Sequence, residues 1–141
     1  FLCDVPIEII NELKTNLSFK EYKRAAFASE ENQRTLKAVD YLKNGDVVQL
    51  GNLLYSSHEG LRDLYEVSCK ELDFLVDFTR NISSVKGARM MGGGFGGCTL
   101  NIVKEDYVDL FINDISQAYL EKFNIKLTPH IVKTNNGAKV L

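Results

Sequence analysis

Residues 92–97 of this chain hold five glycines and one phenylalanine, in the order Gly92-Gly93-Gly94-Phe95-Gly96-Gly97. Glycine adopts positive φ angles and lets the backbone approach another group closely, but ordering it costs more entropy than ordering other residues. Such a run therefore needs a compensating contact. Backbone N–H groups can bind a phosphate without any charged side chain, so phosphate chemistry is one interpretation. Close packing against neighbouring backbone is the other.

The spacing Gly92-x-Gly94-x-x-Gly97 formally matches the glycine pattern of dinucleotide-binding proteins, but its context does not. That pattern requires a helix directly after the glycines, whereas residues 98–103 alternate in hydrophobicity like a strand. The Gly-Lys-Ser/Thr ending of a Walker phosphate loop is missing. So are the downstream motifs of a protein kinase. The sequence therefore argues against all three classes.

Other reactive residues lack the partners that catalysis or metal binding would need. No residue forms a triad-like context with His58, so we expect it to pack in the fold or lie on the surface. We expect Cys98 to be buried in a strand. Cys69 should lie in the first turn of a helix, where a thiol pKa can be lowered. Arg89 is expected to form an ion pair or to lie at the edge of a cleft. The three cysteines show no metal-ligand or disulfide spacing.

Composition limits the classes of protein to which the chain can belong. It has 141 residues, 45% of them hydrophobic and 26% charged, as in a single globular domain. A net charge of −2 gives no support to nucleic-acid binding. No apolar run approaches the ~20 residues that span a membrane, and no signal peptide is present. We therefore expect no membrane partner, and the lack of disulfide spacing among the cysteines favours a reducing, cytoplasmic setting. Because the sequence opens on Phe1 like the middle of a protein, we expect residues 1–141 to be one domain of a longer chain.

The first half of the chain, which must position the glycines, has helical signals. A short amphipathic segment starts near Ile7, and a long helix should run to about Leu42. A further helix with an apolar face should follow, and a third should end near residues 81–84. The expected termini are marked by a capping box at Ser18 and Glu21, a left-handed cap at Gly45, an N-cap at Asp46, and a second capping box at Ser68 and Glu71.

The second half of the chain alternates between strand and helix patterns. We expect strands at 85–90 and 98–103, with Cys98, Leu100 and Ile102 on one face of the second strand. A helix with an apolar stripe is expected at 106–123. A strand at 128–134, a turn at 135–137 and a final strand at 138–141 should follow. This order predicts an α+β domain with an antiparallel sheet covered by helices on one face.

The glycine run and its surroundings resemble a known family. Residues 87–98, Gly-Ala-Arg-Met-Met-Gly-Gly-Gly-Phe-Gly-Gly-Cys, closely resemble the third conserved motif of galactokinases, members of the GHMP small-molecule kinase family. Residues 61–73 resemble the galactokinase segment that precedes this motif, and Ser57-His58 and Gly137-Ala138 look similar as well. The strong match covers residues 57–103. Two long blocks in the right order and spacing are more specific than a glycine run alone.

The resemblance implies transfer of the ATP γ-phosphate, with Mg²⁺, to the anomeric hydroxyl of galactose, in a cleft between two domains. This chain would be the ferredoxin-like C-terminal domain, with residues 92–97 shaping the floor of the active site and Arg89 and Met91 lining the cleft. The second-motif phosphate loop, the catalytic aspartate with its arginine partner, and most sugar contacts belong to the N-terminal domain. We therefore expect no catalytic residue and no metal ligand in this chain, and expect it to be inactive alone. The N-terminal domain of the same protein is the expected partner.

Three positions depart from the family pattern. Met91 stands where threonine is usual, Lys70 where proline is common, and Leu64 where an acidic residue is common. Two other functions stay open beside galactokinase. One is a non-catalytic galactose-sensing paralogue that keeps the fold. The other is a GHMP kinase acting on mevalonate, homoserine or a different sugar, although the block at residues 61–73 favours galactokinase.

Overall fold

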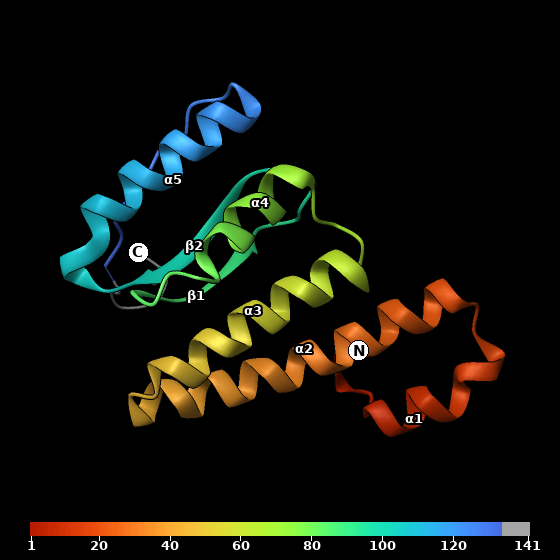
Figure 1. The fold of residues 1–141 in the computed structure, drawn as a ribbon. Coiled ribbons are helices and arrows are strands. Elements are labelled where there is room, and N and C mark those ends of the chain that lie inside the picture. Colours follow the sequence, from red (N-terminus) through yellow and green to blue (C-terminus); the bar gives the residue numbers. More distant parts are fainter. Residues whose placement is uncertain (134–141) are drawn as a thin grey trace, which may run out of the picture.

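The computed structural model describes residues 1–133, in which a long helical hairpin packs against a small sheet and two further helices (Figure 1). Three short 3₁₀ turns at Leu2–Asp4, Leu13–Asn16 and Glu105–Tyr107 complete this part of the chain. Its mixture of helices with an antiparallel sheet confirms the predicted α+β class. The helices are α1 (Ile7–Glu12), α2 (Phe19–Asn44), α3 (Val47–Asp63), α4 (Lys70–Thr79) and α5 (Val108–Phe123), and the strands are β1 (Val85–Met91) and β2 (Cys98–Val103).

Local signals set the ends of α2 and α3 as predicted. At the start of α2, the backbone N–H of Ser18 donates to Glu21 Oε2 at 2.9 Å and that of Glu21 donates to Ser18 Oγ at 3.3 Å, which forms the capping box. Gly45 ends α2 in the left-handed conformation, with φ 69°. Asp46 then caps α3 by accepting the N–H of Gln49 at 3.0 Å. These caps let α2 and α3 fold back on each other as a hairpin.

The sheet is an antiparallel pair whose register runs from Val85 opposite Val103 to Met91 opposite Cys98. The predicted strands at 85–90 and 98–103 are confirmed within one residue. Helix α3 packs against β1, α4 contacts both strands, and α5 packs on α4 (Figure 1). The glycine loop, residues 92–97, therefore leaves and re-enters the sheet at the end nearest the connection between α3 and α4.

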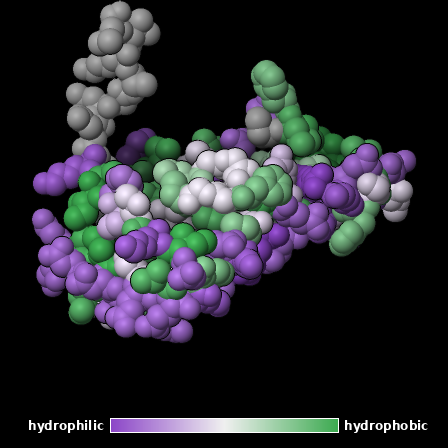
Figure 2. Space-filling view, turned by 90° about the horizontal axis from the view of Figure 1, so that it is seen from above, coloured by the Kyte–Doolittle hydropathy of each residue, from purple (hydrophilic) through white to green (hydrophobic). Residues whose placement is uncertain are grey.

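Two groups of buried side chains form the core. One joins α4, β1 and α5, and the other joins α2, α3, α4 and β1, so α4 and β1 belong to both. Figure 2 shows the face seen from above in Figure 1, where hydrophilic side chains gather along one edge and less polar ones lie across the middle. The first group is Leu75, Val85, Phe111, Ile115 and Tyr119, and the second is Phe27, Leu61, Leu72 and Met90.

The expectation that Cys98 is buried in its strand is wrong. Cys98 is exposed and Leu100, on the same face, is 37% exposed, whereas Val103, on the other face, packs against the first core group. Both faces of this strand carry residues that tolerate burial, so alternation alone does not identify the inner one. The helices α4 and α5 cover the face that holds Val103. Cys98 lies on the other face of β2 and is therefore exposed.

Two further predictions of local structure are wrong. The side chain of Ser68 does not cap α4; its Oγ donates to Asp73 Oδ1 at 2.6 Å, and Cys69 is the N-cap without a side-chain cap. The predicted strand at 128–134 is absent from its described part, residues 128–133, where Ile131 and Val132 are exposed. In the described residues β1 and β2 pair only with each other, so this segment has no strand partner there. The turn and strand predicted over 135–141 lie outside the described residues.

Candidate functional site

The glycine loop has a backbone that most L-residues rarely adopt. Its φ angles are 90° at Gly92 and Gly94, 138° at Gly96 and 105° at Gly97. Phe95 also has a positive φ of 60°, which costs about 1–2 kcal/mol for a residue with a side chain. Its ring is nevertheless 76% exposed, so burial of the ring does not offset this strain. The main chain of the loop must be held by other contacts.

Val67, in the connection between α3 and α4, provides one of these contacts. The N–H of Phe95 donates to the carbonyl oxygen of Val67 at 2.7 Å. Gly94 lies so close that a Cβ on it would be 2.1 Å from the same oxygen. Only glycine permits this approach, in both its φ angle and its lack of a side chain. The loop thus rests directly on neighbouring backbone.

The connection that carries Val67 is itself tied to α2. Glu66 has a positive φ of 63°, and its Oε1 accepts a hydrogen bond from Lys23 Nζ at 3.0 Å. The Lys23 hydrogen bond lowers the pKa of Glu66 below its usual value. Tyr65 packs its ring on Phe27, with the ring centroids 5.3 Å apart. These contacts stabilise the one segment on which the loop rests.

The main chain of Met90, two residues before the loop, is held by two side chains, one from α3 and one from the neighbouring residue of β1. Its side chain is fully buried. His58 Nδ1, on α3, accepts the N–H of Met90 at 3.2 Å, and the Nε of Arg89 donates to the Met90 carbonyl at 2.9 Å. The backbone is therefore fixed just before the glycines begin.

Arg89 is engaged in a charged cluster that joins β1 to α2 and α3. Its Nη1 lies 3.1 Å from Glu31 Oε1, and Arg34 Nε lies 2.7 Å from Glu31 Oε2. Ser57 Oγ donates a short hydrogen bond to the same Oε1 of Glu31. The ion-pair alternative for Arg89 is thus confirmed. With its guanidinium committed to Glu31 and Met90, Arg89 acts in this structure as a tie between elements.

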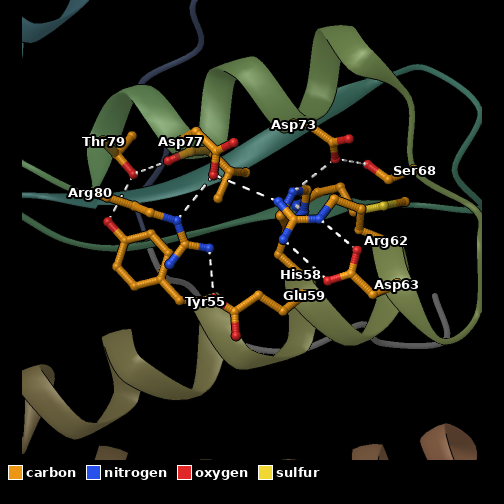
Figure 3. A network of polar contacts seen from close by, with 12 residues as sticks. Tyr55, His58, Glu59, Arg62, Asp63, Ser68, Asp73, Asp77, Thr79 and Arg80 are labelled. Atoms are coloured by element: carbon orange, nitrogen blue, oxygen red, sulfur yellow. Dashed lines mark hydrogen bonds and ion pairs between the residues drawn. The ribbon is translucent and has the colours of Figure 1, made fainter.

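His58 lies at the centre of a polar network between α3 and α4 (Figure 3). It is fully buried, so the expectation that it packs in the fold is confirmed. Its Nε2 lies 3.2 Å from Asp73 Oδ1, at an angle outside that of a hydrogen bond. Burial lowers the pKa of His58 below its ordinary value, and Asp73 acts in the opposite direction. The imidazole is therefore neutral at pH 7.

A cavity of about 290 Å³ opens beside the glycine loop, between the start of α4 and the end of α5. Glu71 supplies its carboxylate, and the hydrogen bonds it accepts from its own N–H and from Cys69 lower its pKa. The lining includes no lysine or arginine, so the cavity cannot by itself neutralise a phosphate. Neither Arg89 nor Met91 is part of it. The lining residues are Cys69, Glu71, Leu72, Leu75, Phe95, Gly96, Gly97, Tyr119, Ile125 and Leu127.

The main-chain N–H groups are the atoms of the glycine loop that could bind a ligand. Within residues 1–133, the N–H of Phe95 has a backbone acceptor, and those of the five glycines have none outside the strands. Successive N–H groups in a loop of this kind can cradle an anion. The described residues contain no cluster of three histidines, cysteines or carboxylates that could hold a metal ion. No described helix is long and apolar enough to cross a membrane.

Comparison with known proteins identifies the family. Residues 38–121, more than half of the chain, match the family described as GHMP kinases C terminal. The chain belongs to the GHMP kinases. It is similar to a galactokinase of Thermotoga neapolitana, with 48% identity over 117 residues that make up 83% of this chain and 33% of that protein. A galactokinase of Clostridium acetobutylicum is 51% identical over 83% of this chain and 30% of its own length.

A solved structure resembles this GHMP kinase chain over most of its length. It is the Lactococcus lactis galactokinase in complex with galactose, which superimposes with a TM-score of 0.84 at 35% sequence identity. The match covers 89% of this chain and 32% of the other. This GHMP kinase chain therefore spans about a third of the length of the relatives it matches. The glycine loop belongs to a fold that it shares with that galactokinase structure.

Sequence reasoning missed the contacts that hold the loop in this GHMP kinase domain. Val67 and Glu31 gave no signal of their own, because each acts through a tertiary contact. One signal was available: Gly51 lies inside a helix, where glycine is unfavourable unless another backbone comes close. A Cβ on Gly51 would lie 1.7 Å from the carbonyl oxygen of Lys86, and a Cβ on Gly87 would lie 2.4 Å from Gly51 Cα. This contact sets α3, and with it His58, against β1.

Proposed function

We propose that this chain is the C-terminal domain of a galactokinase, which transfers the γ-phosphoryl group of ATP to the anomeric hydroxyl of galactose. The observation that carries the proposal is the similarity to galactokinases at 45–48% identity over 83–94% of the chain. The structural match to a galactokinase in complex with galactose supports it further. In this assignment the remaining two-thirds of the protein form the partner domain, and the enzyme works in the cytoplasm.

The glycine loop, residues 92–97, is proposed to form the part of the active site that this domain contributes. Its free N–H groups support a role beside the phosphates, since phosphoryl transfer depends on positioning and on stabilising charge more than on covalent steps. Phe95 and Met91 are 76% and 50% exposed, which leaves both side chains available for contact with a partner domain. Arg89 would act indirectly, by fixing the strand that leads into the loop.

The described residues do not fit a complete kinase site. They hold no cluster suited to Mg²⁺, and the cavity beside the loop has no positive side chain in its lining. No catalytic step is therefore assigned to a residue of this chain. ATP and Mg²⁺ would be bound mainly by the partner domain, and the isolated chain is expected to be inactive. The relatives found are galactokinases, which does not favour a galactose sensor or a kinase for mevalonate or homoserine.

A chimeric enzyme tests this proposal directly. The segment of the Clostridium acetobutylicum galactokinase that aligns with this chain is replaced by this chain, and galactose 1-phosphate is measured with ATP and Mg²⁺. We expect galactose phosphorylation within about tenfold of the parent enzyme, because the two segments are 51% identical. A folded chimera that fails to phosphorylate galactose would contradict the proposal. Mevalonate, homoserine and other sugars serve as competing substrates, and the isolated chain is the negative control.

A further inference from the structure

Both main-chain polar groups of Met90 are bound by side chains. Strand β1 pairs with β2 along one edge, while α3 packs against β1. His58 Nδ1 accepts the Met90 N–H at 3.2 Å, and Arg89 Nε donates to the Met90 carbonyl at 2.9 Å. Of these two side chains, only the imidazole changes its charge near neutral pH. The backbone two residues before Gly92 thus depends on a group that can titrate.

The hydrogen bond to Met90 fixes the proton of the imidazole. A ring nitrogen that accepts a hydrogen bond carries no proton, so the neutral His58 holds its proton on Nε2. That nitrogen faces Asp73 Oδ1 at 3.2 Å. A second proton would have to bind Nδ1, and a protonated Nδ1 cannot accept a hydrogen bond from Met90. Protonation and this contact therefore exclude each other.

The groups around His58 set the pH at which this happens. Burial opposes the charged form most strongly, so the pKa lies below the ordinary value of 6.5. Asp73 and Asp77 of α4 favour protonation, while Arg62 of α3 and Arg80, which follows α4, oppose it. On the side of β1 the ring meets the backbone of Met90. At neutral pH the contact with Met90 is intact, and acid breaks it.

We propose that His58 is a positioning residue that holds the start of the glycine loop through Met90 and releases it when the imidazole is protonated. Gly92 follows Met90 by two residues, and the opposite end of the loop is held separately through Phe95 and Val67. Loss of the contact with Met90 would loosen the approach to the loop while this second contact remains. The link to catalysis rests on the proposed function, whereas the link between His58 and the loop does not.

Two substitutions of His58 separate its two nitrogens. The Oδ1 of asparagine can take the place of Nδ1, so His58→Asn keeps an acceptor for Met90 but cannot titrate. Glutamine reaches the place of Nε2 and not that of Nδ1, so His58→Gln keeps a polar group near Asp73 and loses the acceptor. A purely structural role would make the longer and shorter amides similarly harmful. The positioning role predicts that asparagine rescues and glutamine does not.

The test follows backbone amides by ¹⁵N NMR in the chain between pH 8 and pH 5. In the wild type we expect the Met90 amide and the amides of Gly92 and Gly93 to shift with one shared midpoint below pH 6.5. In His58→Asn these pH-dependent shifts should vanish, while the Met90 amide stays protected from exchange at pH 8. In His58→Gln the Met90 amide should exchange with solvent about 5-fold faster or more even at pH 8, as for a lost hydrogen bond of about 1 kcal/mol.

Several outcomes would overturn the inference. One is that the amides of Gly92 and Gly93 shift with a pH midpoint different from that of Met90. Another is that the amides of His58→Gln exchange with solvent as slowly as those of the wild type. If His58→Gln does not fold, the pH-dependent amide shifts of wild type and His58→Asn still test the inference. In the chimera, wild type should lose kcat below the midpoint and His58→Asn should lose less. A chimera without kinase activity would contradict the proposed function and leave the NMR result standing.

Discussion

Substitution of Gly94 by alanine tests whether contact with neighbouring backbone holds the glycine loop. The new Cβ would lie 2.1 Å from the carbonyl oxygen of Val67, and the main chain there cannot rotate away as a side chain could. The φ of 90° adds about 1–2 kcal/mol of strain for alanine. Separating the two segments would also break the hydrogen bond from Phe95, worth about 1 kcal/mol. We expect the closed loop to be destabilised by about 2–3 kcal/mol.

Gly96 provides the matched control for this prediction. Its φ of 138° also disfavours alanine, but a Cβ on it would meet nothing within 4 Å. Gly96→Ala should therefore show the conformational strain without the collision. Because loops can open without global unfolding, the difference should appear in local amide exchange.

Hydrogen exchange of the Phe95 amide is the assay for both variants. A loss of about 2–3 kcal/mol corresponds to exchange about 30- to 150-fold faster in Gly94→Ala, because 1.4 kcal/mol is about tenfold. The amides of α3 around Gly51, which packs against the opposite end of β1, should keep their protection. Equal exchange rates of the Phe95 amide in Gly94→Ala and Gly96→Ala would refute the reasoning, because strain in φ alone would then account for the faster exchange in both variants.

Other regions of the fold give independent predictions. Gly51→Ala should lower the free energy of unfolding, measured in urea, by about 3 kcal/mol, because a Cβ cannot fit between α3 and β1. Gly45 has open space around it, so Gly45→Ala should lower the free energy of unfolding by only about 1 kcal/mol, the cost of the left-handed conformation. Faster alkylation of Cys98 than of Cys69, followed by mass spectrometry, is expected because Cys98 is exposed and Cys69 half-buried; equal rates would contradict the placement of β2. His58 should make the free energy of unfolding fall as the pH drops below 6.5, by at most about 1.4 kcal/mol per pH unit, because its folded pKa is depressed and the unfolded chain binds the proton first. In urea titrations, the change of stability with pH should differ between wild type and His58→Asn only in that pH range.

Predictions that depend on neighbours along the chain succeeded where the end of the helix was also predicted correctly. Ser18 and Glu21 lie three residues apart and need no distant group to form a capping box. Gly45 is similar, because the left-handed cap depends on its own φ. Ser68 failed because α4 begins at Lys70, so Cys69 is the N-cap and Ser68 lies one residue too early to cap the helix; its hydroxyl donates to Asp73 instead. A capping box is predicted correctly only when the first residue of the helix is also predicted correctly.

Features that depend on tertiary packing could not be predicted from the sequence. The bounds of β2 followed from its residues, but the choice of inner face depended on where α4 and α5 lie. The glycine loop was recognised from its composition, yet its contact with Val67 depends on a segment about 27 residues earlier in the sequence. His58 gave no sign that its acceptor would meet Met90, 32 positions later. Pairings of this kind arise from the fold and have no local pattern.

The direct contact between Gly51 and Gly87 has a mechanical consequence. Two backbones touch there without an intervening layer of side chains, and side chains are the part of a protein interior that can change rotamer to absorb a displacement. A shift of α3 along its axis would therefore be transmitted to β1 almost undiminished. A displacement of the α2–α3 hairpin would therefore reach the glycine loop as a displacement of the whole strand.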